Sequence, residues 1–205
     1  MKFDRAGVCE RCFRPKFDCF CGKVVSFDNK IAVTILQHPQ EQLKVLNSAR
    51  LAHLLLKHSR IFVGLSWSNF KKVAGPEALP SEWGVLYLKP YIQGEKLGNR
   101  AQPSGPVMIV NRKKQPIETT AFLRGIIAID GSWKQAKTLW WRNPWLLKLN
   151  RISLNPDHPS MRPQVKEEGL STIEAIALTL EYLGENPEIA VSLRTYYQNL
   201  IIGDI

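Results

Sequence analysis

The sequence predicts an α/β protein built on a mainly parallel sheet with helices on both faces, plus a small N-terminal segment that carries four cysteines. Three observations lead to this prediction. Short apolar runs of the length of buried strands alternate with longer amphipathic segments along most of the chain. Hydrophobic residues make up 44% of the 205 positions, which is enough for a substantial core. All four cysteines lie within the first 21 residues.

The expected elements follow from hydrophobic periodicity and from the turn residues that bound each run. Strands are expected at 31–37, 60–64, 84–88, 107–110, 126–129 and 151–154, and helices at 39–58, 132–142, 172–183 and 187–202. The segment 155–169 has three prolines and no periodicity. A loop of that length inside a compact domain is usually functional.

The other elements are arranged around the stretch from Gly125 to Pro144. An apolar run that ends at Ile129 is followed at once by Asp130 and Gly131, and a capping box that begins at Ser132 opens the next helix. In open α/β sheets, ligands bind at the carboxyl ends of strands, against helix N-termini. Asp130 is therefore the candidate functional carboxylate. The alternative is an ordinary turn in which the aspartate only orders the backbone.

Four tryptophans follow Asp130 in the sequence. Trp133 lies beside the turn, where its indole offers a flat wall for a purine or a pyrimidine. Trp140 and Trp141 are expected on the core-facing side of the helix, and Trp145 is expected to pack with them.

The cysteines form a compact cluster, with Cys9 and Cys12 separated by two residues and Cys19 and Cys21 by one. Four thiolates this close in sequence can close a tetrahedral site, and structural zinc is the ion that we expect. An iron–sulfur cluster or free thiols are the alternatives. Residues 1–26 have little core of their own, so a metal would supply much of their folding energy. Residues 27–205 are expected to form the second unit.

The chain carries 28 Lys and Arg against 18 Asp and Glu, a formal net charge of +10. This excess suits a polyanionic partner such as nucleic acid. The densest basic run, Arg112 to Lys114, is a candidate phosphate contact or a solvated turn, and Arg50 is a candidate anion contact or a snorkelling side chain. No apolar run is long enough to span a membrane, and the first residues do not resemble a signal peptide. A cytoplasmic location is expected.

Several motifs, taken in order, resemble those of the DTW-domain family of tRNA-uridine aminocarboxypropyltransferases. They are the cysteine cluster with Arg14-Pro15, Gln37-His38-Pro39 with Glu41, Arg50-Leu51-Ala52, the strand end from Gly84 to Pro90, Asp130-Gly131-Ser132-Trp133 and the run from Leu170 to Ala175. The family has threonine where this chain has Ser132, which keeps the hydroxyl. It has tyrosine before the proline where this chain has Lys89.

The resemblance implies a SPOUT-like knotted sheet that binds S-adenosylmethionine and transfers its 3-amino-3-carboxypropyl group to N3 of a uridine in tRNA. Asp130 would act as the general base. Cofactor contacts are expected from Leu88, Pro90, Gly131, Ser132, Trp133, Leu170, Ser171 and Thr172, and RNA contacts from Arg50, Arg112, Lys113 and Lys114. His38 could be a ligand or a base, although a histidine before a proline is more often structural. Two other functions stay open, namely an RNA methyltransferase on the same fold and a non-catalytic, zinc-containing RNA-binding module.

Overall fold

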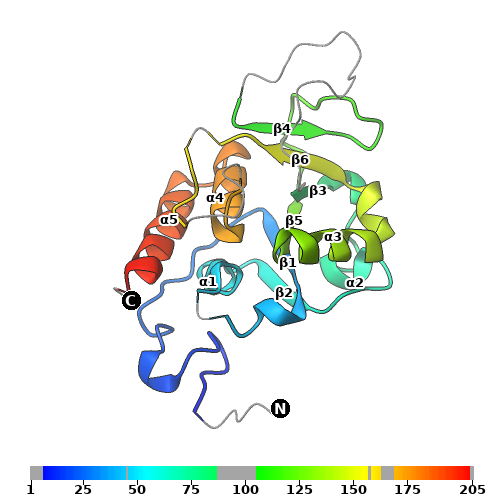
Figure 1. Ribbon diagram of the computed structural model, residues 1–205. Coiled ribbons are helices and arrows are strands. Elements are labelled where there is room, and N and C mark those ends of the chain that lie inside the picture. Colours follow the sequence, from blue (N-terminus) through cyan, green and yellow to red (C-terminus); the bar gives the residue numbers. More distant parts are fainter. Residues whose placement is uncertain (1–6, 45, 87–104, 157, 163–168, 204–205) are drawn as a thin grey trace.

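Figure 1 shows the fold in a computed structural model, which describes residues 7–44, 46–86, 105–156, 158–162 and 169–203. Within these residues the strands form one sheet in the order β2-β1-β5-β3-β6-β4. Their bounds are β1 Ala32–Gln37, β2 Ser59–Val63, β3 Trp83–Leu86, β4 Val107–Val110, β5 Gly125–Asp130 and β6 Asn150–Leu154. Every neighbouring pair is parallel except β4 and β6, which are antiparallel at one edge. The predicted mainly parallel sheet is therefore confirmed.

Strand β5 lies inside the sheet, between β1 and β3, and all six of its residues are buried. Both of its faces are covered, which explains why it reads as an unbroken apolar run in the sequence. It pairs with β1 in a register that sets Gln37 opposite Asp130. Two polar side chains thus meet where the two strands end, at the carboxyl edge of the sheet.

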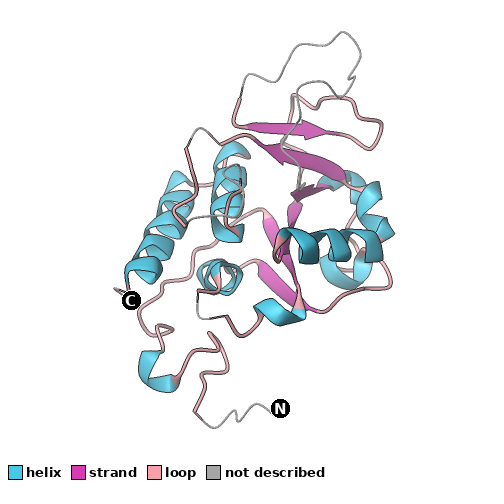
Figure 2. Cartoon of the chain, in the orientation of Figure 1, coloured by secondary structure: helices cyan, strands magenta, loops and turns pink. Residues whose placement is uncertain are grey.

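Helices cover both faces of the sheet, as Figure 2 shows, and each face has its own hydrophobic core. One face carries α1 (Ser48–Leu55), α4 (Thr172–Tyr182) and α5 (Pro187–Ile202), and the other carries α2 (Lys71–Ala74) and α3 (Trp133–Arg142). Short 3-10 turns lie at Lys16–Asp18, Pro39–Glu41, Pro80–Glu82 and Pro144–Lys148. Ile126 and Ile127 of β5 belong to opposite cores, as the pleat of a strand requires.

The helix predicted over residues 39–58 is wrong in its first half. The chain forms a 3-10 turn at Pro39–Glu41, and α1 begins only at Ser48. Asn47 sets this start, because its side-chain oxygen accepts a hydrogen bond from the backbone N–H of Arg50 at 2.8 Å. The leucines are regularly spaced on both sides of Asn47, so the hydrophobic pattern alone does not reveal that the helix starts there.

The burial predicted for Trp141 is also wrong. Its side chain is 79% exposed, whereas Trp145 is 7% exposed and lies in the core. Helix α3 turns Ala136 and Leu139 toward the sheet. Successive residues of a helix do not share a face, so the helix that half-buries Trp140 directs Trp141 away from the core.

The cysteine segment packs on the face of the sheet that carries α1 and α5. Cys12 and Phe20 are buried in the same core as these helices. The hydroxyl of Tyr196 in α5 donates a hydrogen bond to the carbonyl of Lys23 at 3.2 Å. A boundary between two units after residue 26 stays a prediction.

Candidate active site at the carboxyl edge of the sheet

A cavity of about 470 Å³ opens where the parallel strands end. Its volume is in the range of pockets that hold small ligands and cofactors. It is lined by the last residues of three strands, Leu86 of β3, Asp130 of β5 and Leu154 of β6. It is lined also by the first residues of three helices, Ser48 of α1, Trp133 of α3 and Thr172 of α4. Three helix N-termini, each the positive end of a helix dipole, thus border one cavity.

Asp130 is 8% exposed, and both of its carboxylate oxygens accept hydrogen bonds. The hydroxyl of Thr172 donates to Oδ1 at 2.6 Å, and the amide Nε2 of Gln37 donates to Oδ2 at 2.8 Å. Burial raises the pKa of Asp130 above the ordinary value of an aspartate, and these two hydrogen bonds act in the opposite direction. The nearby Glu41 carboxylate raises the pKa further, and Lys44 lowers it. The result is a carboxylate with a stronger affinity for a proton than a solvated one has.

Gln37 connects Asp130 to the start of α1. Its Nε2 also donates to Oδ1 of Asn47 at 3.1 Å, and Asn47 is the residue that caps α1. The amide nitrogen of Asn47 in turn donates to the carbonyl of Glu41 at 2.9 Å. This chain of hydrogen bonds fixes the position of Asp130 relative to α1, just as Thr172 fixes it relative to α4.

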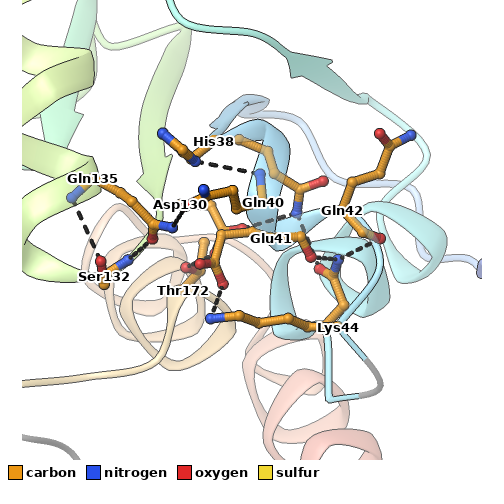
Figure 3. Close-up of polar contacts among 11 residues, drawn as sticks. His38, Gln40, Glu41, Gln42, Lys44, Asp130, Ser132, Gln135 and Thr172 are labelled. Carbon is orange, nitrogen blue, oxygen red and sulfur yellow. Dashed lines mark hydrogen bonds and ion pairs between the residues drawn. The ribbon is translucent and has the colours of Figure 1, made fainter. Parts of the chain in front are cut away.

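Glu41 brings a second carboxylate to the lining of the cavity. Figure 3 shows this residue with Asp130 and Thr172. The residue is 9% exposed, and its Oε2 forms an ion pair with Nζ of Lys44 at 2.8 Å. The other oxygen, Oε1, is buried and has no hydrogen-bond partner among the residues that the structure describes. A buried carboxylate oxygen without a partner is costly, so Glu41 is suited to receive a cationic or hydrogen-bonding group of a ligand.

Both predicted capping boxes are confirmed, and both border the cavity. In α3, Oε1 of Gln135 accepts a hydrogen bond from the N–H of Ser132 at 2.6 Å, and the hydroxyl of Ser132 accepts from the N–H of Gln135. Ser171 and Glu174 form the same pair of bonds in α4. A Cβ at position 131 would lie 2.9 Å from Cβ of Gln135, so Gly131 allows the first of these turns to close tightly.

Carboxylate oxygens of Glu174 also bind two residues in the middle of the long loop 155–169, for which the sequence predicts a functional role. Its Oε2 accepts a hydrogen bond from the hydroxyl of Ser160 at 2.6 Å, and its Oε1 accepts one from the N–H of Met161 at 2.8 Å. The loop residues Pro156, Arg162 and Gly169 line the cavity. This side of the cavity therefore carries a guanidinium group.

Most of the predicted cofactor contacts lie together. The residues that line the cavity are Gly131, Ser132, Trp133, Leu170, Ser171 and Thr172. Leu88 and Pro90 lie outside the described residues. His38 is not among the lining residues, and its Nδ1 accepts a hydrogen bond from the N–H of Gln40 at 3.3 Å, as a residue that caps a turn does.

The basic residues predicted to contact RNA are separated in the structure. Arg112, Lys113 and Lys114 are exposed in the turn that follows β4, and none of them lines the cavity. Arg50 is 7% exposed, and its guanidinium carbon lies 4.3 Å from the ring centre of Phe13. Burial lowers the pKa of Arg50, and the charges of Asp130 and Cys12 oppose that shift. Contact of these four residues with RNA stays a prediction.

The sulfur atoms of the four cysteines all lie within 4.8 Å of one another, and the cysteines are free. Cys9 and Cys21 are 3.8 Å apart at Sγ, and Cys12 and Cys19 are 3.7 Å apart. A tetrahedral ion with metal–sulfur bonds of about 2.3 Å would separate its ligands by about 3.8 Å. A hydrogen bond from the backbone of Cys12 lowers the pKa of Cys9 to about 6, although burial opposes it. The four thiols are therefore close enough together to hold a metal ion.

Sequence reasoning did not include Glu41, Lys44 or Asn47 among the site residues. They fall in the segment that was expected to be continuous helix, and no local pattern places them at the end of β5. The asparagine, an N-cap residue followed by Ser-Ala-Arg, was the available signal for a helix start.

Comparison with known proteins gives consistent results over most of the chain. The model of the DTW domain matches residues 6–202. A Drosophila melanogaster protein named tRNA-uridine aminocarboxypropyltransferase 2 is 27% identical over 197 residues, which cover 93% of this chain and 72% of that protein. Proteins of the same name from Macaca fascicularis and Mus musculus are 27% and 26% identical, over 92% and 89% of this chain. The chain spans only 60% and 58% of the length of these two relatives. No solved structure matches it.

None of the helices that the structure describes has the length and apolarity to cross a membrane.

Metal binding by the four cysteines can be tested independently of these relatives. We expect the purified protein to contain one metal ion per chain, measured by elemental analysis. Cys12→Ser should lose the ion and lower Tm, because binding of structural zinc contributes on the order of 10 kcal/mol or more to the folding of such segments. Phe17→Ala, at an exposed position in the same segment, is the control and should keep both the metal ion and the Tm of the original protein. Metal-free protein with the Tm of the original would contradict the assignment, and visible absorption would indicate an iron–sulfur cluster.

Proposed function

This chain belongs to the DTW domain family, and from that premise we propose that it transfers the 3-amino-3-carboxypropyl group of S-adenosylmethionine to N3 of a uridine in tRNA and releases methylthioadenosine. The observation that carries the proposal is the buried carboxylate of Asp130 at the border of a cavity shared by three helix N-termini. The donor would supply an electrophilic carbon bonded to a sulfonium. The residues of the cavity would bind and orient the two substrates.

The cavity offers complementary groups for each part of such a donor. A carboxylate is favoured at helix N-termini, which Ser132 and Ser171 open here, and Arg162 lies on the same cavity. Apolar side chains at the strand ends and at Leu170 suit an adenine ring, and Trp133 can stack on a base. Leu88 and Pro90 stay predicted contacts.

Asp130 would accept the proton of uridine N3 and so make that nitrogen a nucleophile. Its two hydrogen bonds do not prevent this, because each carboxylate oxygen has a second lone pair. They hold the carboxylate in one orientation, and burial gives it a raised pKa, which makes it a better base near neutral pH.

Glu41 would bind the ammonium group of the aminocarboxypropyl tail. Glu41 lines the cavity, and its Oε1 has no partner among the described residues, so a small side-chain rotation would let an ammonium donor satisfy it. The carboxylate of the tail would be repelled by the two acids and attracted by the helix N-termini. This separation of charges would orient the tail within the cavity.

Three finer points complete the proposal. The ion held by the four cysteines is zinc, for which four thiolates are one of the usual ligand sets in structural sites. The sheet is a SPOUT-like knot, and the position of β5 between two strands that precede it in the chain is compatible with such a threaded topology. The cationic turn from Arg112 to Lys114 contacts tRNA phosphates. A cytoplasmic location stays a prediction.

The direct test is to incubate the protein with total tRNA and S-adenosylmethionine and to identify both products by mass spectrometry. Methylthioadenosine together with 3-(3-amino-3-carboxypropyl)uridine is the expected result. S-adenosylhomocysteine and a methylated nucleoside would indicate the methyltransferase instead. Binding of tRNA without any modified nucleoside would indicate a non-catalytic RNA-binding module.

Asp130→Asn should lower kcat by about 10²- to 10⁴-fold, the usual contribution of a general base, with little change in donor affinity. The base works only when it is deprotonated. The rate of the original protein should therefore fall as the pH falls through a pKa above that of an ordinary aspartate.

The control for this assignment is Thr172→Val, which removes a hydrogen bond that lowers the pKa of Asp130. The acid limb of the pH profile should move to higher pH in this variant. An Asp130→Asn enzyme with the original rate and pH profile would show that another group removes the proton.

Glu41→Gln should weaken binding of S-adenosylmethionine by about 10- to 100-fold, because a hydrogen bond to a charged group contributes on the order of 1.5–3 kcal/mol. Methylthioadenosine has no ammonium group, so it should bind the variant and the original protein equally. Isothermal titration calorimetry measures both affinities. An equal loss for the two ligands would mean that Glu41 shapes the cavity and does not recognise the ammonium.

A further inference from the structure

The exposed face of α3 carries an aromatic side chain that is not packed in either hydrophobic core. Trp141 is 79% exposed, although the same helix buries Ala136 and Leu139. One exposed apolar side chain does not by itself indicate a partner. The chemistry of its neighbours decides whether this face of the helix binds one.

Lys134, Lys137 and Trp141 form a stripe along this helix. They occupy positions i, i+3 and i+7, which lie on one side of an α-helix, and all three are exposed. The stripe extends over about 10 Å at 1.5 Å per residue. We call these three residues the α3 stripe.

The charges that α3 and the 3-10 turn after it carry have one sign. From Trp133 to Lys148 the charged residues are Lys134, Lys137, Arg142 and Lys148, and all four are exposed. A run of exposed cations attracts a polyanion. A second protein copy would be repelled by the same charges.

The α3 stripe is continuous with the candidate active site. Helix α3 begins at Trp133, three residues after Asp130, and Lys134 lines the cavity. The other end of the stripe, Trp141, lies in the last turn of α3 and does not line the cavity. Helix α3 covers the face of the sheet opposite to α4 and α5 (Figure 1). A strand of RNA with one nucleotide in the cavity could therefore continue along the helix.

We propose that the α3 stripe binds the single-stranded RNA that flanks the target nucleotide, with the indole of Trp141 stacked on an unpaired base and the lysines paired with phosphates. This inference rests on the proposed tRNA-modifying function. Stacking platforms beside cationic side chains are the usual way in which proteins bind single strands without reading their sequence. The stripe provides both within two turns of one helix.

The experiment measures binding of a labelled oligouridylate and of total tRNA to the full chain at several salt concentrations. Trp141→Ala should weaken binding of both by about 5- to 100-fold, the range for loss of one stacked base, and Trp141→Phe should restore most of it. Lys137→Gln should reduce the slope of log affinity against log salt by about 0.7 to 0.9, the value for one phosphate contact.

Matched controls come from the other layer of the molecule. Tyr182→Ala, at a half-exposed aromatic residue in α4, and Lys30→Gln, at an exposed lysine before β1, should leave both affinities unchanged. Calorimetric binding of S-adenosylmethionine reports whether Trp141→Ala and Lys137→Gln keep an intact cavity, which we expect because neither residue lines it.

The outcomes separate this inference from the proposed function. If the original protein modifies tRNA and the variants bind both RNAs as tightly as it does, the α3 stripe is not the RNA surface. If Trp141→Ala changes only the oligomeric state, measured by light scattering, the stripe binds a second copy and the inference is overturned. If the variants lose RNA binding while the original protein forms no modified nucleoside, the surface is supported and the transferase assignment fails.

Discussion

Burial of the Asp130 carboxylate is the constraint on which the rest of the site depends. A buried charge is costly unless hydrogen bonds compensate it, and here the two donors come from different parts of the chain, Gln37 of β1 and Thr172 of α4. The carboxylate is therefore tolerable only when β1, β5 and α4 are all in place. The contacts that compensate its burial also bring together the helix N-termini around the cavity, through the Asn47 cap on one side and the Ser171 cap on the other. Folding of the sheet and assembly of the site are, in this sense, the same event.

The two acids of the cavity differ in how fully they are bonded, and this difference separates their roles. Asp130 has a donor on each oxygen, which fixes its orientation, while Glu41 has a partner on only one. The charge of Glu41 raises the pKa of Asp130. A cation bound at Glu41 would relieve part of this repulsion. Occupation of one acid by a positively charged group and proton transfer at the other are thereby linked through electrostatics alone.

Features encoded by neighbouring residues could be predicted from the sequence, and those that depend on distant residues could not. The apolar run of β5, the capping boxes at Ser132 and Ser171 and the helix from Pro187 to Ile202 are local patterns, and the structure confirms them. The meeting of Gln37 with Asp130 depends on strand register across 93 positions, which no local pattern reveals. The leucines of residues 39–58 have the spacing of one long helix, and this spacing does not show that the cap at Asn47 starts the helix later. Trp141 was misplaced because hydrophobicity predicts burial, whereas the orientation of α3 is set by Ala136 and Leu139.

Arg50 shows how the cysteine segment and the cavity are connected. Its guanidinium packs over Phe13, a residue between two cysteines, while the charges of Asp130 and Cys12 both favour its protonated state. Its Nε is buried without a partner among the described residues, so hydrogen bonding alone does not explain its position. The negative charge of Asp130 favours the guanidinium there. Four thiolates around a divalent ion would leave a net charge of about −2, which would stabilise the same guanidinium. With an ion bound, the cysteine segment would therefore act on the site through charge as well as through packing, and removal of its thiolates would leave Arg50 with Asp130 as the remaining one of these two counter-charges.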